Sequence, residues 1–272
     1  MNGNKLLCDI SRSAFEEINK LLSLDQELAQ DLRASATTSR QFIREECITA
    51  LMAARLVRDY KAQVKIVLFT GNEEKKCGAD WYWRFERENG AIHACVQAKR
   101  VGRNYFDQPD SKGSVIFTNE QLEKLNTNLD KYQAKIKQLD AWVATFARAN
   151  LSPPCGYEEL NLCPLHMHCG ECNDIGYEGD NRFSSLWIAK AEKILKRING
   201  KSITMRINNI VEQSIRLDCL LPCIGDESSE HGPASKGFVL SKLSQTFDDC
   251  VEVIQKDKKL SDSFEGAMLI KI

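Results

Sequence analysis

An acid, an amide and an amine occur at close spacing in one stretch of the chain. Residues 78–100 read GADWYWRFERENGAIHACVQAKR and contain Asp80, Gln97 and Lys99. If this stretch folds as two strands joined at the Asn89-Gly90 turn signal, alternate side chains share a face, so Gln97 and Lys99 point the same way. Oxygen ligands suit Mg²⁺, and an amine stabilises developing negative charge. The stretch therefore predicts a metal-dependent site for phosphodiester hydrolysis.

Each of the three side chains has an expected role in such a site. Asp80 is the fixed carboxylate for Mg²⁺ or Mn²⁺, and Gln97 supplies a second oxygen at lower charge than Glu would bring. Lys99 orients the attacking water or stabilises the transition state. The structural alternative is an ordinary salt bridge between Asp80 and Lys99 on neighbouring strands, with Gln97 at the surface.

A helix that precedes this stretch carries a further acidic candidate. Residues 40–59 predict a helix with an apolar face, and helical spacing places Glu45 on that face and Glu46 well around the cylinder. A carboxylate among apolar residues must be paired, protonated or bound to a cation. Glu45 (or Glu46, if the register slips) is therefore a candidate metal ligand or holds a water on the metal. The alternative is a helix-end acid held by an arginine. The apolar face consists of Ile48, Leu51, Met52 and Leu56.

Apolar periodicity and turn residues predict the remaining elements. They are one or two helices in 5–33, a linker at 34–39, a strand at 63–69, a charged loop at 72–77, a loop at 102–117, one or two long helices in 119–150, an edge strand near 151–157, helices at 182–197 and 240–254, and a strand at 268–270. The order of helix, three strands, long helix and strand predicts an α/β fold with a mixed sheet flanked by helices. We expect a helical cap at 1–39, a core at 40–160, and a C-terminal extension at 161–272 packed on the core.

The motif and its setting resemble a known superfamily. Asp80 followed by Gln97-Ala98-Lys99 at a strand end is similar to the PD-(D/E)xK nucleases, which have the restriction-endonuclease-like fold. Glutamine in the second position is typical of the Mrr-like branch. The GADW and VQAKR segments resemble, more narrowly, an uncharacterised bacterial family assigned to this fold. The chain departs from the superfamily pattern in having Ala79 where proline is common and Gln97 where an acid is common.

This resemblance implies a function and further site residues. It implies a restriction-endonuclease-like core and a Mg²⁺-dependent endonuclease acting on DNA, with a role in defence against foreign DNA. It also implies a polar patch of Tyr132, Gln138 and Asp140 near the site, with Gln138 as a further catalytic candidate. The alternative is a catalytically inactive module that binds nucleic acid or protein and carries a structural zinc. A second copy of the chain or a defence-system protein is the expected protein partner.

A segment rich in cysteine and histidine predicts a separate metal site. Soft ligands with a two-residue gap between the last two cysteines suit a tetrahedral structural zinc. The alternative is a set of free thiols and histidines on a long loop. The candidate ligands are Cys163, His166, His168, Cys169 and Cys172.

Composition limits the classes of protein to consider. The chain has 272 residues, with 37 Lys and Arg against 38 Asp and Glu, so it lacks the basic excess of a nucleic-acid coat protein. Eleven cysteines without a signal-peptide pattern suggest reduced thiols and a cytoplasmic location. No apolar run approaches the roughly 20 residues of a membrane span. Arg84, Lys99, Arg100 and Arg103 form a local basic cluster for phosphate contacts or for solvent, and Trp81 and Trp83 are expected to fill the core.

Overall fold

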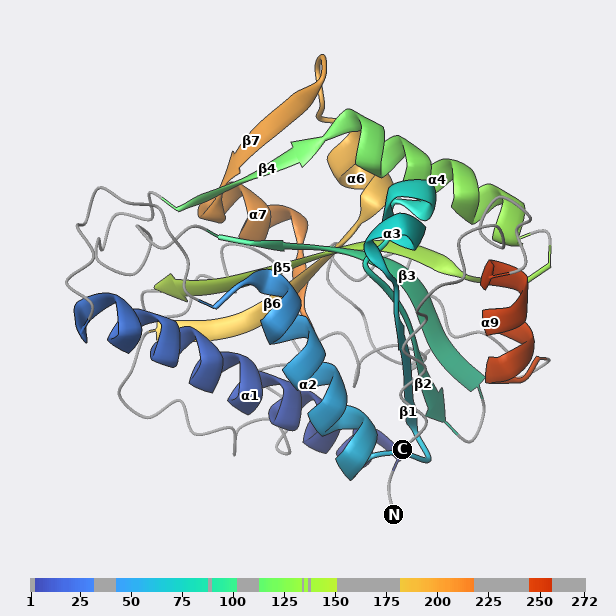
Figure 1. The fold of residues 1–272 in the computed structure, drawn as a ribbon, viewed down its shortest axis with the longest axis horizontal. Coiled ribbons are helices and arrows are strands. Elements are labelled where there is room, and N and C mark those ends of the chain that lie inside the picture. The colour runs from blue at the N-terminus through green and yellow to red at the C-terminus, as the bar shows by residue number, and fades with distance from the viewer. Residues whose placement is uncertain are drawn as a thin grey trace.

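The computed structural model describes residues 3–31, 43–87, 90–101, 113–133, 135–136, 138–150, 182–217 and 245–255. Figure 1 shows the elements in chain order. They are α1 (Gly3–Asp31), α2 (Glu45–Asp59), β1 (Val64–Leu68), α3 (Gly71–Cys77), β2 (Trp81–Arg87), β3 (Gly90–Arg100), β4 (Ser114–Thr118), α4 (Asn119–Gln133), β5 (Asp140–Asn150), β6 (Arg182–Lys190), α6 (Ala191–Leu195), β7 (Ser202–Arg206), α7 (Ile207–Gln213), β8 (Ile215–Arg216) and α9 (Phe247–Gln255).

A six-stranded mixed sheet forms the centre of the molecule, with strand order β1-β2-β3-β5-β6-β8. The β2–β3 pair is the predicted antiparallel hairpin, with Trp81 opposite Val96 and Arg87 opposite Gly90. β3 and β5 run parallel, and the other neighbouring strands in this sheet are antiparallel. β4 and β7 form a separate two-stranded sheet. The predicted turn residues 88 and 89 lie outside the described residues.

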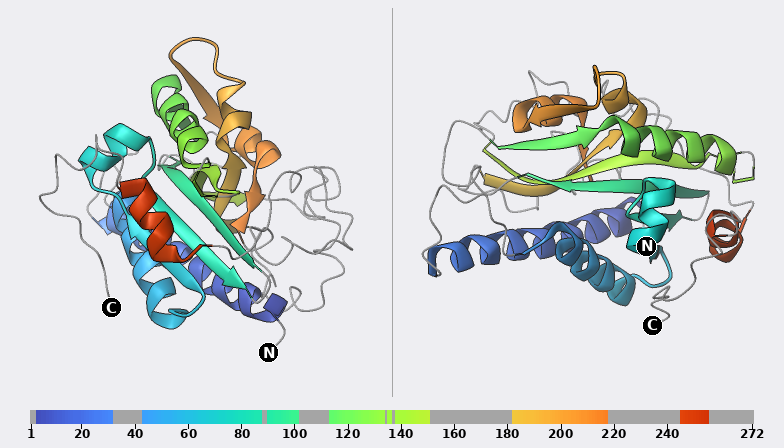
Figure 2. Two further views of the ribbon diagram at one scale, coloured as in Figure 1. Left: turned by 90° about the vertical axis from the view of Figure 1, so that its right-hand side faces the viewer. Right: turned by 45° about the horizontal axis from the view of Figure 1, so that its top comes forward.

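Helices cover both faces of the central sheet, which gives the molecule three layers. α1 and α2 lie on one face, and α3, α4, α6 and α7 lie on the other (Figures 1 and 2). Each face has its own apolar cluster: Trp81, Trp83 and Trp142 pack toward α1 and α2, while Trp187 belongs to the cluster on the other face. The α/β fold class with a mixed sheet flanked by helices is therefore confirmed, as is the burial of Trp81 and Trp83.

Two predicted helices proved to be strands over much of their length. The helical prediction for 119–150 holds only for α4, because residues 140–150 form β5. The prediction for 182–197 holds only for the short α6, because residues 182–190 form β6. Both strands lie inside the sheet and are buried on both faces, so their apolar residues run nearly continuously instead of alternating. A continuous apolar run does not distinguish a strand from a helix.

Two predicted loops contain regular structure. Residues 72–77 lie in α3, which begins with a capping box in which the Thr70 hydroxyl accepts from the Glu73 amide and the Glu73 carboxylate accepts from the Thr70 amide. Residues 114–118 form β4, whereas 102–112 lie outside the described residues. The predicted linker, the edge strand near 151–157 and the strand at 268–270 also lie outside them.

The central sheet continues across the predicted boundary between residues 160 and 161. β6 pairs with β5 along its full length, and β8 pairs with β6, so both strands belong to the same sheet as the predicted core. α1 also packs directly on that sheet through Ile10, Ile18 and Leu22. Within the described residues, none of the helices is long and apolar enough to cross a membrane.

Candidate metal-binding site

The β2–β3 hairpin brings Asp80 and Gln97 together. The Asp80 amide donates to the Val96 carbonyl (2.7 Å) and its carbonyl accepts from the Phe69 amide (2.8 Å), so the residue sits in line with β2 and opposite Gln97. Gly78 ends α3 and connects it to the segment that contains Asp80. Its φ is +78°, and a Cβ there would lie 2.5 Å from the Gln121 carbonyl oxygen, so the approach requires glycine.

The Gln97 side chain is completely buried beside the Asp80 carboxylate. Its Nε2 donates to Asp80 Oδ2 (2.7 Å) and to the Ala98 carbonyl (3.1 Å), and the Ala98 amide donates to the same carboxylate oxygen. Gln97 Oε1 is buried without a hydrogen-bond partner among the described residues. A buried carbonyl oxygen without a partner is costly, and it is a ligand that a divalent cation can use.

Lys99 lies on the same face and contacts α2. Its Nζ is 3.8 Å from Glu45 Oε1, and the two side chains are only 20% and 24% exposed. Glu46 instead points to solvent, where it is 70% exposed and lies 3.6 Å from Arg44 Nε. Of the two acidic candidates on α2, the structure therefore brings Glu45, and not Glu46, to the strand residues.

Negative charge is concentrated around this site. Burial is the main cause that raises the pKa of Asp80 to about 8; the nearby carboxylates of Glu74 and Glu45 act in the same direction, and the Ala98 amide and Lys99 oppose them. Burial also raises the pKa of Glu45, and Glu46 and Glu74 add to this effect, while Lys99 opposes it. Glu74 comes from α3, a segment that the sequence predicts to be a charged loop. Lys99 thus lies near Asp80 and Glu45, and Glu74 adds negative charge near both carboxyls, which favours a bound cation.

A fully buried ion pair holds the start of α2 in place. Arg100 Nη2 lies 2.6 Å from Asp25 Oδ2 of α1, and the two side chains are 1% and 0% exposed. Asp25 Oδ1 accepts from the Ile43 amide (2.6 Å), and Arg100 Nη1 donates to the Ile43 carbonyl. Arg44, the N-cap residue of α2, makes no side-chain capping bond, and the ion pair instead fixes Ile43, the residue before it. It joins the residue after Lys99 to the segment that leads into Glu45.

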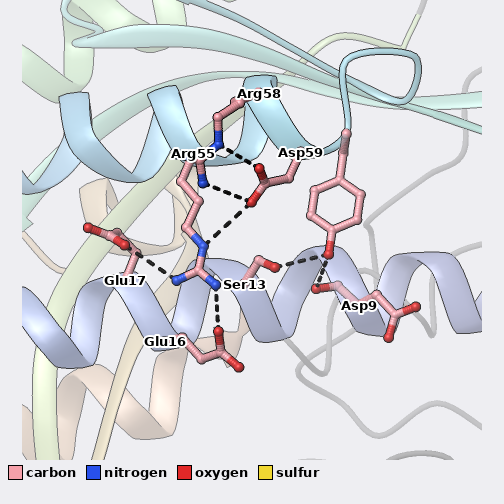
Figure 3. A network of polar contacts seen from close by, with 8 residues as sticks. Asp9, Ser13, Glu16, Glu17, Arg55, Arg58 and Asp59 are labelled. Carbon is pink, nitrogen blue, oxygen red and sulfur yellow. Dashed lines mark hydrogen bonds and ion pairs between the residues drawn. The ribbon is translucent and has the colours of Figure 1, made fainter.

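A second contact ties α1 to the far end of α2. Arg55 contacts Glu16 (2.5 Å), Glu17 (3.3 Å) and Asp59 (3.7 Å), as Figure 3 shows. Nearby, the Tyr60 hydroxyl donates to the Asp9 carbonyl (3.1 Å). Since α2 is held at both ends, Glu45 has a defined position relative to β3.

The other predicted site residues lie elsewhere. Gln138 is exposed in a turn before β5, and β5 begins opposite Ala94, at the level of β3 away from Lys99. Asp140 pairs with Lys190 (2.5 Å) and accepts from the Trp142 indole, while Tyr132 is buried in the apolar cluster. The structure therefore does not bring the predicted polar patch to Asp80. The five candidate zinc ligands lie outside the described residues.

The predicted basic cluster is used inside the protein. Arg84 is buried, with Nε 3.0 Å from Glu86 Oε1 and Nη1 directed to Cys250 Sγ at 3.7 Å. Arg100 is buried against Asp25, and residue 103 lies outside the described residues. Neither arginine is available to a phosphate, so the expectation of an exposed cluster at this position is wrong for both.

The donor set at Asp80 fits a hard divalent cation bound with few protein ligands. Across the described residues, no group of three or more His, Cys, Asp or Glu side chains is arranged to hold a metal ion. Asp80 and the orphaned Gln97 Oε1 provide one carboxylate and one amide oxygen. Mg²⁺ accepts such a set because it commonly keeps several waters and uses one or two carboxylates plus substrate oxygens.

Comparison with known families places the chain in one of unknown function. A family model described as a family of unknown function, DUF6615, matches residues 7–265, which is nearly the whole chain. The chain therefore belongs to this family. No curated protein matches it.

Proposed function

We propose that this member of the DUF6615 family is a metal-dependent nuclease that hydrolyses phosphodiester bonds, with DNA as the expected substrate. One observation carries the proposal: Asp80 and Gln97 are in contact across two strands, Lys99 shares their face beside Glu45, and the buried Gln97 Oε1 lacks a partner among the described residues. This combination supplies metal ligands and a cation for the reacting phosphate at one place.

The finer fold proposal is a restriction-endonuclease-like core. The order of elements supports it, since α2 is followed by β1, β2 and β3, then by α4 and β5, with α3 and β4 as additions. The parallel pairing of β3 with β5 after a helical crossover fits a core of this kind.

The roles of the chain's own residues follow from their contacts. Asp80 and Gln97 would hold Mg²⁺ or Mn²⁺, which when bound polarises the phosphoryl oxygen and acidifies a water. The Ala98 amide and Gln97 Nε2 both donate to Asp80 Oδ2 and fix its orientation. Lys99 stabilises negative charge that develops on the phosphate, because its amine is partly buried and less screened by solvent. Glu45 Oε1, 3.8 Å from Lys99 Nζ, directs the amine along the strand end.

A second candidate is a module that binds nucleic acid or protein without cutting. Gln97 favours it, since an amide replaces the second acid and its Nε2 occupies one oxygen of Asp80. Both features lower the affinity for a cation relative to a pair of free carboxylates. The two candidates differ in one measurable property, which is turnover.

Cleavage of supercoiled plasmid with Mg²⁺ or Mn²⁺ tests the proposal. We expect nicking or linearisation by the wild type, none by Asp80→Ala or Lys99→Ala, and none in EDTA. Glu45→Gln and Glu46→Gln form a matched pair of neighbouring substitutions, one at the site and one in solvent. The first should slow cleavage at least tenfold and the second should leave it unchanged. Cutting that persists in Asp80→Ala and Lys99→Ala would refute the assigned site, and binding without cutting by the wild type would favour the second candidate.

A further inference from the structure

The site itself offers few groups for the rest of a nucleic-acid backbone. Arg84 and Arg100 are buried in internal contacts, and Lys99 is engaged with Glu45. Much of the affinity of proteins for DNA comes from lysines and arginines that contact phosphates away from the reacting bond. A nuclease with this site therefore needs an exposed basic surface elsewhere.

One segment of the described chain has the required composition. Residues 193–206 contain Lys193, Lys196, Arg197, Lys201 and Arg206 and no acidic residue, although the whole chain has 37 basic and 38 acidic residues. All of these except the half-buried Lys193 are exposed. Lys196 forms a solvent-exposed pair with Glu192 at 3.2 Å, which is weak because water screens it.

The strand that ends this segment presents hydroxyl groups beside the charges. β7 pairs with β4 in antiparallel register, with Arg206 opposite Ser114, Thr204 opposite Ile116 and Ser202 opposite Thr118. By alternation these six side chains share the outer face, whereas Val115, Phe117 and Met205 are buried on the inner face. Residues 113–118 also lack acidic groups. Arg, Lys, Ser and Thr are the side chains that usually contact phosphates, so this face has matching chemistry.

The same surface is well placed for a long ligand. The turn between α6 and β7 projects from the body of the molecule in both Figure 1 and the left view of Figure 2. It contains Lys196, Arg197 and Lys201, and Arg206 lies at the other end of β7. The charges are thus spread along the strand, which spans about 15 Å at roughly 3.3 Å per residue and so covers several phosphates.

We propose that this surface, formed by residues 196–206 and the outer face of β4, binds the phosphate backbone of duplex DNA. The inference deepens the proposed nuclease function and rests on it for the choice of ligand. The surface contributes affinity without sequence preference, since its groups match phosphates and sugars and not base edges. Ile116, which is 58% exposed, lies among the hydroxyl groups, where it would pack against the sugars of the bound DNA backbone.

A charge-removal variant tests the proposal by binding. The surface variant combines four substitutions, Lys196→Gln, Arg197→Gln, Lys201→Gln and Arg206→Gln. Its binding to a fluorescein-labelled 30-base-pair duplex is followed by anisotropy in EDTA at several salt concentrations. The slope of log K against log salt is negative, and each lost phosphate contact reduces its magnitude by about 0.9. We expect the magnitude of the slope to decrease by about 2–4 and the affinity at low salt to fall about 10- to 100-fold.

A matched control separates this surface from net charge. Four exposed lysines elsewhere, changed together to Gln, remove the same charge and should leave the slope within about one unit of the wild type. These control positions are Lys20, Lys61, Lys131 and Lys135. Thermal unfolding checks that both quadruple variants fold, which their exposed positions favour.

The outcomes distinguish this inference from the nuclease proposal. If the surface variant binds the duplex as tightly as the wild type, or if the wild type does not bind it, the inference is overturned. If the wild type binds through this surface but never cuts plasmid with Mg²⁺ or Mn²⁺, the nuclease function fails and the DNA-binding surface stands. Equal loss of affinity in the two quadruple variants would also reject a specific surface, because net charge alone would then explain it.

Discussion

The Asp80→Asn substitution should stabilise the metal-free protein while abolishing cleavage. Asp80 is a buried carboxyl whose pKa is raised to about 8, chiefly by burial and further by Glu74 and Glu45. At a pH above the ordinary pKa of an aspartate, folding must therefore either bury the charged carboxylate of Asp80 or protonate it. Asparagine removes this cost and keeps an oxygen that can accept from the Ala98 amide and Gln97 Nε2. It cannot supply the charge that a cation requires.

The size of the stabilisation follows from the pKa. A shift from 3.8 to about 8 corresponds to an upper limit on the order of 5 kcal/mol at pH 8, at 1.36 kcal/mol for each tenfold change in proton affinity. The weaker hydrogen bonds to a neutral oxygen and the relaxation of the site reduce this value. We expect a net gain of about 1–3 kcal/mol, or roughly 2–10 °C in melting temperature for a chain of this size.

The pH dependence gives the prediction its sign. A carboxyl with a raised folded-state pKa contributes no penalty below about pH 4, where it is protonated in both states. The penalty grows from pH 4 to pH 8 and is constant above. The difference in unfolding free energy between Asp80→Asn and the wild type should therefore be small at pH 4 and largest at pH 8, measured by denaturant titration in EDTA.

Asp140→Asn is the matched control for this experiment. Asp140 also begins a strand and is largely buried, but Lys190 Nζ lies 2.5 Å from its carboxylate. Burial raises the pKa of Asp140 as well, but Lys190 opposes this effect and the substitution removes their ion pair, so the control should be destabilised by roughly 1–3 kcal/mol. If Asp80→Asn is destabilised as well at pH 8, or if its effect does not vary with pH, the argument from the burial of a charged carboxylate is wrong.

Three further predictions concern the surroundings of the site. Asp25→Ala removes the partner of the buried Arg100, so it should lower the unfolding free energy by about 3–5 kcal/mol and speed amide exchange in the first turn of α2. The exposed Glu16→Gln should lower the unfolding free energy by less than about 1 kcal/mol. Denaturant titration and hydrogen exchange measure both variants. Mg²⁺ at 10 times its Kd should raise the wild-type unfolding free energy by about 1.4 kcal/mol, and Gln97→Leu should abolish this gain in thermal scans because it removes Oε1. Gly78→Ala forces a Cβ against the α4 backbone at positive φ and should cost about 2 kcal/mol or more by denaturant titration.

Local patterns in the sequence were sufficient for the strand part of the site. Alternation along 94–99 and the Asn-Gly turn signal placed Asp80, Gln97 and Lys99 on one face, since these relations depend on neighbouring residues. The choice of Glu45 over Glu46 followed from helical spacing with Ile48 and Met52. α3 was missed, although Thr70 and Glu73 have the spacing of a capping box. That signal was available in the sequence, and it would have brought Glu74 into consideration.

Features that depend on distant contacts could not be predicted in the same way. β5 and β6 look helical in the sequence because both of their faces are buried, and only the sheet order explains this. Arg84 and Arg100 suggested a basic surface because Cys250, which contacts Arg84 in the core, and Asp25, the partner of Arg100, are far along the chain. Asp25 is 75 residues from Arg100, and nothing local to either residue indicates the pair.

The buried Asp25–Arg100 pair changes the view of α1 as a simple cap. A buried ion pair is weak support for stability, because desolvation of both charges offsets their attraction. The position of the pair is more informative. Asp25 accepts a hydrogen bond from the Ile43 amide, Arg100 donates one to the Ile43 carbonyl, and Arg100 directly follows Lys99. An apolar pair could fill this space but could not bind both the amide and the carbonyl of Ile43. The contact therefore fixes the strand that carries Lys99 relative to the helix that carries Glu45, and α1 takes part in building the site.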